Sequence, residues 1–219
     1  MKISIIIPVK NGSNYLKEAL ESIAAQGMDT ETIVVDDGSG DNTSEIAAAF
    51  GATVLRHPES RGQVVAKNTG LAAATGDCIM FLDHDDRIRP GALRQMAEAL
   101  QQDPEAAAVQ ARVKDFLSPE IGEMKGTIIR PDAYYGLFTG AILIRRACFE
   151  KTGLFPENIH DGEIIYWHTR MEQCGLPIRK LDLVSTDRRI HNTNFGKTNK
   201  EKEYKDFATI LRARLKGNK

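Results

Sequence analysis

Runs of apolar residues alternate with amphipathic stretches from the start of this chain, and this alternation restricts its fold more than any other feature. The apolar runs are rich in Ile, Val and Leu, as buried strands are, and occupy residues 2–9, 32–35, 52–56 and 78–82. Apolar residues recur with helical spacing in residues 16–24, 43–50, 64–74 and in a stretch after Pro90. This order predicts an α/β fold in which a mostly parallel sheet has helices on both faces.

The second half of the chain is less regular. Residues 116–135 contain two prolines and two glycines, which predict a long loop or hairpin and a candidate lid. Further strands are predicted at 141–144 and 178–184, and further helices at 146–152, 163–174 and 200–215. Because no repeat or linker separates the halves, we expect one domain over residues 1–195, followed by a basic helix within 196–219.

The composition is that of a soluble globular protein, with 42% hydrophobic and 27% charged residues. No apolar run approaches the roughly 18 residues that indicate a transmembrane helix. The N-terminus opens directly into a predicted strand and lacks the apolar core of a secretory signal. Three widely spaced cysteines fit free thiols in a reducing compartment. We therefore expect a cytoplasmic protein.

Charge is distributed unevenly along the chain. Residues 188–219 hold ten Lys or Arg and three Asp or Glu, so this tail carries +7 and the remainder −8 within a net charge of −1. One interpretation is a solvated helix end. The other is peripheral contact of the tail with anionic lipid at the inner face of the cell membrane. Nucleic-acid binding is disfavoured because the body is acidic and the tail has few interleaved aromatic residues.

Acidic residues follow two predicted strands, at the sheet edge where open α/β proteins bind ligands. Asp36 and Asp37 follow the strand at 32–35, and no Lys or Arg close in sequence offsets their charges. Asp41 or Thr43 is the expected cap of the next helix. The two adjacent carboxylates suit a nucleobase N–H or a ribose hydroxyl as a hydrogen-bond donor.

Asp83, Asp85 and Asp86 place three carboxylates within four residues after the strand at 78–82. Clustered carboxylates raise one another's pKa unless a cation neutralises them. Mg²⁺ or Mn²⁺, held by one or two carboxylates together with diphosphate oxygens, suits this cluster. The structural alternative is a turn that caps the helix after Pro90.

In combination, these segments resemble the large family 2 of inverting glycosyltransferases, which have the GT-A fold of nucleotide-diphospho-sugar transferases. The resemblance covers about residues 3–195. Its motifs are Ile-Ile-Ile-Pro-Val-Lys-Asn at 5–11, Val-Val-Asp-Asp-Gly-Ser at 34–39, Lys-Asn-Thr-Gly at 67–70, Phe-Leu-Asp-His-Asp-Asp at 81–86, and the segments 140–146, 153–155 and 162–163 before Trp167 and Arg170. It implies a nucleotide-sugar-binding half in residues 1–115 and an acceptor half in 116–195.

The resemblance implies a nucleotide pocket made by residues of the first half. Pro8 and Asp37 match positions that contact the base, with Asp36 nearby and Asn11 in the adjoining pocket. Lys67 stands where the family more often has Arg, and it contacts either a phosphate or the aspartates after the fourth strand.

The resemblance also implies a metal and diphosphate site. Asp83, His84 and Asp85 match the Asp-any-Asp motif, in which Asp83 faces the ribose or the sugar. Asp85 and Asp86 then face the metal and the diphosphate. His191 matches a histidine that reaches the metal or the diphosphate in several relatives, and its two flanking arginines suit phosphate. A packed side chain is the alternative for His191.

The catalytic base is where the sequence departs from the family pattern. Many relatives carry Glu-Asp at the start of the helix predicted at 163–174, and the Asp is their base. Here Glu163 stands at the Glu position and Ile164 at the Asp position. The base is therefore Glu163 or Asp161, with Glu163 favoured because it opens the helix directly after Gly162. The alternative is that Glu163 only complements the helix N-terminus.

These residues predict a metal-dependent glycosyltransferase. It would move a hexosyl or N-acetylhexosaminyl group from a nucleotide-diphospho-sugar, with UDP the commonest nucleotide, to a carbohydrate, lipid-linked or protein acceptor in polysaccharide or cell-envelope biosynthesis. Ile164 favours one alternative, a non-catalytic nucleotide-sugar-binding relative. A sugar-phosphate nucleotidyltransferase is the second alternative, against which stands the lack of a Gly-rich N-terminal loop followed by Arg and Lys.

Overall fold

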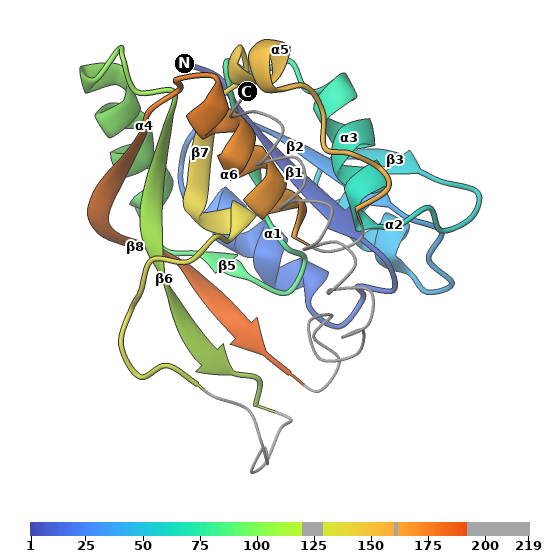
Figure 1. Cartoon of the computed structure of the whole chain (residues 1–219). Coiled ribbons are helices and arrows are strands. Elements are labelled where there is room, and N and C mark those ends of the chain that lie inside the picture. The colour runs from blue at the N-terminus through green and yellow to red at the C-terminus, as the bar shows by residue number, and fades with distance from the viewer. Residues whose placement is uncertain (120–128, 160–161, 192–219) are drawn as a thin grey trace.

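The computed structural model of the chain describes residues 1–119, 129–159 and 162–191 (Figure 1). The strands in these ranges are β1 (Ile3–Val9), β2 (Thr30–Asp36), β3 (Thr53–Arg56), β4 (Cys78–Phe81), β5 (Arg87–Ile88), β6 (Ala108–Leu117), β7 (Ile142–Arg145) and β8 (Ile178–Ile190). The helices are α1 (Leu16–Ala24), α2 (Thr43–Ala49), α3 (Gln63–Ala73), α4 (Ala92–Gln102), α5 (Cys148–Thr152) and α6 (Glu163–Gln173), with a 3₁₀ turn, η1 (Thr139–Ala141).

All the strands belong to one sheet, in the order β3-β2-β1-β4-β7-β6-β8-β5. The first four strands of this order are parallel to one another, whereas β7 is antiparallel to both β4 and β6. Strand β8 runs parallel to β6, and β5 is antiparallel to β8. The carboxyl ends of β1, β2 and β4 therefore meet at one edge of the sheet, while β6 and β8 project from the body (Figure 1).

Two apolar layers cover the sheet, because successive side chains of a strand point to opposite faces. On one face Ile5 and Ile7 of β1 pack with α1, α2 and α4. On the other face Ile6 packs with α3, α5 and α6. This arrangement confirms the predicted α/β fold with helices on both faces of the sheet.

Several predicted elements differ in the structure. Strand β6 was not predicted, and β8 continues six residues past the predicted end at Val184 to Ile190. Helix α4 begins at Ala92, two residues after Pro90. Phe116 and Leu117, expected in a long loop, end β6, and Tyr134 forms a bridge with Val113. Of the loop and candidate lid predicted at 116–135, residues 120–128 lie outside the described residues, as does the basic helix predicted within 196–219.

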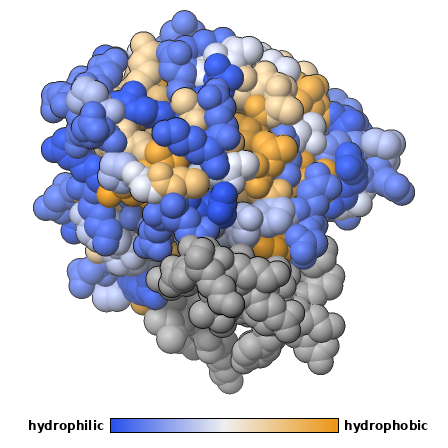
Figure 2. Space-filling view, turned by 45° about the horizontal axis from the view of Figure 1, so that its top comes forward, coloured by the Kyte–Doolittle hydropathy of each residue, from blue (hydrophilic) through white to orange (hydrophobic). Residues whose placement is uncertain are grey.

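Hydrophilic side chains cover most of the face shown in Figure 2, with apolar side chains gathered in patches between them. The exposed large apolar residues of the described ranges are Met1, Phe50, Leu117, Tyr135, Leu137 and Leu154. None of the helices described is both long enough and apolar enough to cross a membrane.

Candidate active site

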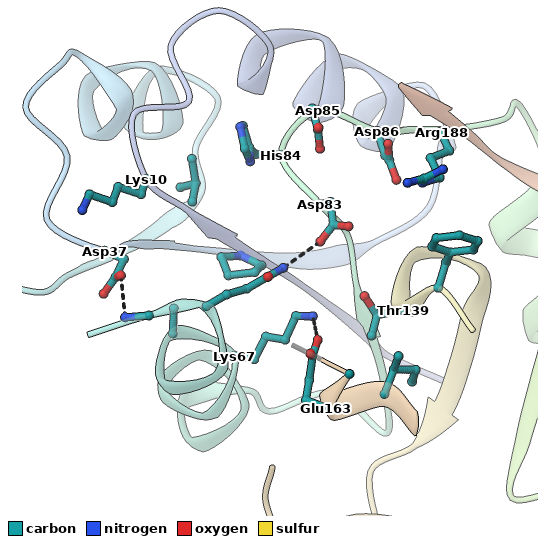
Figure 3. Close-up of a pocket in the computed structure, with 18 of the residues that line it drawn as sticks. Lys10, Asp37, Lys67, Asp83, His84, Asp85, Asp86, Thr139, Glu163 and Arg188 are labelled. Atoms are coloured by element: carbon teal, nitrogen blue, oxygen red, sulfur yellow. Dashed lines mark hydrogen bonds and ion pairs between the residues drawn. The ribbon is translucent and has the colours of Figure 1, made fainter. Parts of the chain in front are cut away.

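A pocket of about 680 Å³ opens at the carboxyl edge of the sheet (Figure 3). Its walls come from the ends of β1, β4 and β8, the loops after β2 and β3, and the starts of α3 and α6. The lining residues that the sequence predicted as functional are Pro8, Asp37, Lys67, Asp83, His84, Asp85, Asp86, Glu163 and His191. The fold thus brings together side chains that lie more than 150 residues apart in the sequence.

The Asp37 carboxylate binds the loop at residues 60–62, which forms part of the pocket wall. Its Oδ1 accepts hydrogen bonds from the backbone N–H of Arg61 at 2.8 Å and from His57 Nδ1 at 2.7 Å. Its Oδ2 accepts from the Ser60 hydroxyl at 2.8 Å and from the Gly62 N–H at 2.9 Å. Burial alone would raise the pKa of Asp37, but these hydrogen bonds hold that pKa below its ordinary value. Asp37 therefore fixes the loop that supplies Ser60 and Gly62 to the pocket wall.

Asp36 and Asn11 do not line the pocket. The Asp36 carboxylate is fully buried under the turn after β2, where it accepts from the Ser39 N–H at 2.8 Å and from the Ser44 hydroxyl. Arg56 lies 3.5 Å from it and offsets its charge. The exposed Asn11 side chain accepts from the Gly40 N–H at 2.9 Å. Both side chains thus brace the turn between β2 and α2, Asp36 from the end of β2 and Asn11 from the loop after β1.

The acidic turn at residues 83–86 forms the wall of the pocket beyond β4. Gln63 Nε2 donates to Asp83 Oδ1 at 3.2 Å. Asp85 Oδ2 lies 2.7 Å from Nε2 of His191, which joins the turn to the end of β8. His84 also lines the pocket, and a Cβ atom at Gly12 would lie only 2.9 Å from its Cδ2, so a glycine at position 12 makes room for the ring.

The three carboxylates of the acidic turn have different pKa shifts. Burial raises the pKa of Asp83, against the nearby charge of Lys67. Burial and the negative charges of Asp85 and Asp83 raise the pKa of Asp86 well above its ordinary value. Burial also acts on Asp85, but the hydrogen bond from His191 and the charges of two histidines hold its pKa below the ordinary value. Burial and mutual repulsion thus raise the pKa of two of the three carboxylates, an effect that a bound cation would oppose.

Lys67 and Glu163 form a buried ion pair between α3 and α6 (Figure 3). Lys67 is only 2% exposed and Glu163 only 6%, although both line the pocket. Ile164, at the position where the resemblance implies an Asp, is apolar pocket wall. Asp161, the other candidate base, lies outside the described residues.

The two arginines before His191 point in different directions. Arg188 lines the pocket, with its guanidinium 4.6 Å from the centre of the Phe138 ring and 3.5 Å from the Asp115 carboxylate. Arg189 is 1% exposed and bonds to Glu18 and Ser118 outside the acidic turn. Both arginines line the pocket, and the side chain of Arg188 is 30% exposed against 2% for Arg189. The phosphate contact expected of them stays a prediction.

The residues present fit part of a divalent cation site. Among the described residues, no three His, Cys, Asp or Glu side chains surround a common point. Asp85, Asp86 and His191 nevertheless lie together, and Mg²⁺ usually takes only one or two carboxylates plus substrate phosphates and water. A cation at this place would therefore need diphosphate oxygens and water to complete its coordination.

Sequence reasoning missed His57, which is buried between Asp37 and Thr69. It also missed the pocket residues Gln63, Phe138 and Thr139. A signal for His57 was present, because it directly follows β3, just as Asp37 follows β2. Phe138 and Thr139 follow an irregular segment and carry no comparable signal.

Solved structures with the same architecture place the fold in the GT-A class of glycosyltransferases. TarS from S. aureus, in complex with UDP, matches 96% of this chain with a TM-score of 0.75 and 22% identity, and the chain covers 64% of that structure. The mannosyltransferase PcManGT from Pyrobaculum calidifontis, in complex with GDP-Man and Mn²⁺, matches 96% with a TM-score of 0.73 and 21% identity, over 64% of its own chain. At these identities the likeness concerns the fold.

The chain belongs to Glycosyl transferase family 2, whose family model matches residues 4–167. This confirms the family that the sequence motifs predicted. Pre-mycofactocin glycosyltransferase from Mycobacterium tuberculosis strain H37Rv is 29% identical over 85% of the chain. An uncharacterized glycosyltransferase of Rickettsia prowazekii is 28% identical over 94%. The chain spans 43% of the mycobacterial relative and 70% of the rickettsial one.

Proposed function

We propose that the chain transfers a sugar from a nucleotide-diphospho-sugar to an acceptor hydroxyl, with inversion at the anomeric carbon. The observation that carries this proposal is the convergence of five carboxylates and Lys67 in one pocket at the carboxyl edge of the sheet. Family membership supports the reaction class. The complexes of TarS with UDP and of PcManGT with GDP-Man support a nucleotide-sugar donor. We propose that the donor of this chain is a UDP-sugar.

On the donor side, we propose that the nucleobase lies between Pro8 and the loop held by Asp37. A carboxylate has about four acceptor positions, and Asp37 already accepts four hydrogen bonds from that loop. Asp37 therefore acts mainly by shaping the base pocket. Ser60 and Gly62, which the loop presents to the cavity, are then the groups that contact the base. We propose that Asp83, which accepts a hydrogen bond from Gln63, also accepts one from the ribose or the sugar.

We propose that Asp85, Asp86 and His191 hold Mg²⁺ or Mn²⁺ together with the donor diphosphate. When bound, the cation supplies Lewis-acid stabilisation of the diphosphate leaving group. The Mn²⁺ in the PcManGT complex supports a divalent ion in this fold. Arg188, half-buried on the same side of the pocket, adds a positive charge next to Asp86. His84 lines the wall beside the diphosphate position.

Glu163 is the proposed general base. Its carboxylate takes the proton of the acceptor hydroxyl while the acceptor oxygen attacks the anomeric carbon. The bond from that carbon to the diphosphate breaks, and the nucleoside diphosphate leaves with the bonding electrons. Lys67 holds the Glu163 carboxylate in place from α3. Asp161 stays the second candidate for this role.

A non-catalytic nucleotide-sugar-binding protein is the second candidate function, and Ile164 in the pocket wall favours it. Glu163→Gln separates the two candidates. For a transferase we expect loss of sugar transfer or donor hydrolysis, with UDP-sugar binding retained. Glu172→Gln, on the exposed part of the same helix, is the matched control and should keep activity. Binding of donors with no turnover by the unaltered protein would favour the second candidate.

The acceptor and the location of the protein remain predictions from the sequence. A carbohydrate, lipid-linked or protein acceptor would enter from the side of Phe138 and Thr139. Peripheral contact of the basic tail with anionic lipid predicts stronger pelleting with anionic than with neutral liposomes. Equal pelleting with both would contradict it.

A further inference from the structure

Arg189 connects the acidic turn to two other parts of the molecule. Its backbone N–H donates to Asp86 Oδ1 at 2.9 Å, and its Nε donates to the carbonyl oxygen of Asp85 at 3.0 Å. The guanidinium also donates from Nη1 to Ser118 Oγ at 3.1 Å and from Nη2 to Glu18 Oε2 at 2.6 Å. The side chain thereby ties the backbone of Asp85 to Ser118, just after β6, and to Glu18 of α1, while the backbone N–H of Arg189 holds the Asp86 carboxylate.

Two aromatic rings pack against the guanidinium of Arg189. Its central carbon lies 4.7 Å from the centre of the Tyr15 ring and 4.6 Å from that of Phe116. The Tyr15 ring in turn lies 5.0 Å from the His191 ring, centre to centre. Because His191 contacts Asp85, the same cluster restrains both the backbone and the side chain of Asp85.

We infer that Arg189 is a positioning residue that sets the geometry in which Asp85 and Asp86 meet the metal and the diphosphate. The inference rests on the proposed function. Arg189 is almost completely buried, and its bond to Asp85 goes to the carbonyl oxygen, so it orders the turn without occupying the carboxylate that faces the cavity. A lysine retains the charge but cannot donate along the three directions of a planar guanidinium.

The test measures UDP binding by calorimetry over a range of Mn²⁺ concentrations, with Arg189→Lys and the matched control Arg87→Lys. Arg87 shares two partners with Arg189, since it lies 3.4 Å from Glu18 Oε2 and 4.0 Å above the Phe116 ring. It does not line the pocket. Arg189→Lys should raise the half-saturating Mn²⁺ concentration roughly 10- to 100-fold, as loss of outer-shell support of a metal site does. Arg87→Lys should leave it unchanged.

The outcomes separate the inference from the proposed function. The inference is wrong if Arg189→Lys binds UDP with the same Mn²⁺ requirement as the unaltered protein. It is also wrong if the substitution weakens UDP binding equally with and without Mn²⁺. If the unaltered protein shows no Mn²⁺ dependence, both the metal role and the inference are wrong. Should Arg189→Lys fail to fold, Glu18→Gln replaces it, because it weakens the outer anchor of the guanidinium, and so its hold on the turn, without changing Arg189 itself. An unchanged Mn²⁺ requirement in Glu18→Gln would then overturn the inference.

Discussion

The ammonium group of Lys67 and the carboxylate of Glu163 form an ion pair on the floor of the pocket, where the two residues are only 2% and 6% exposed. The pair joins α3 to the first residue of α6. Removing one partner of a buried pair leaves an uncompensated charge, whereas removing both does not. The pair therefore holds the proposed general base, Glu163, against α3, which lines the proposed donor site.

Lys67→Met should destabilise the protein by about 3–5 kcal/mol, because it leaves the Glu163 carboxylate buried without its partner. The double variant Lys67→Met with Glu163→Gln should recover much of this loss. Urea denaturation of the single and double variants measures the coupling between the two positions. Additive effects of the two substitutions would contradict a buried ion pair.

His57→Gln should lower both the stability of the fold and the affinity for UDP. The imidazole is buried and contacts Asp37 at 2.7 Å and Thr69 at 3.0 Å, so its loss leaves buried polar groups without a partner, at a cost of about 1–3 kcal/mol. His168→Gln, a substitution on a partly exposed face of α6, is the control. Unchanged UDP affinity in a destabilised His57→Gln protein would show that the loop bound by Asp37 does not shape the nucleobase pocket.

Glu31 should give the protein a stability that depends on pH. Burial raises its pKa, but hydrogen bonds from Ser4, Thr75 and Lys2 outweigh this and lower the pKa from 4.5 to about 2. A group with a lowered pKa in the folded state contributes stability at pH values above 4.5, and this contribution is lost as the pH falls toward 2.

Glu31→Gln tests this pH dependence. After allowance for solvent screening, we expect it to lower the free energy of unfolding by about 1–2 kcal/mol at pH 7. The difference from the unaltered protein should shrink progressively between pH 4.5 and pH 2. Glu98→Gln, on the exposed side of α4, should have no such effect. A difference of constant size over this pH range would contradict the role of the ionised carboxylate.

The sequence predicted the layers of the fold because its parallel strands are buried on both faces and read as continuous apolar runs. The same criterion missed β6, in which apolar Val109, Ala111 and Val113 alternate with polar residues. That alternation is itself a strand pattern, with a period of two residues. A search limited to continuous apolar runs finds the parallel strands of such a sheet but misses β6, which lies between β7 and β8.

Positions near the sheet edge were predictable, but the directions of their side chains were not. Asp36 and Asp37 are adjacent and chemically identical, yet the first lies under a turn and the second lines the pocket. Arg188 and Arg189 at the end of β8 both line the pocket, yet Arg189 is buried and bonds to Glu18, whereas Arg188 lies against Phe138 and Asp115. Successive residues of a strand point to opposite sides, so the register of the strand decides which one reaches the ligand. The long-range pairs Lys67–Glu163 and His57–Asp37 depend on packing and have no local signal in the sequence.

The measurement that most directly tests the central claim is a thermal-shift panel of UDP, GDP, CDP and dTDP, each with and without Mn²⁺. A ligand present at one hundred times its Kd stabilises a fold by about 2.7 kcal/mol, which such a panel detects. We predict stabilisation by one nucleotide, UDP, that requires Mn²⁺, disappears in Asp85→Asn and persists in the control Asp182→Asn, whose side chain is 87% exposed on β8. No stabilisation by any nucleotide, or an equal shift without metal and in Asp85→Asn, would contradict a metal-dependent nucleotide-sugar site in this pocket.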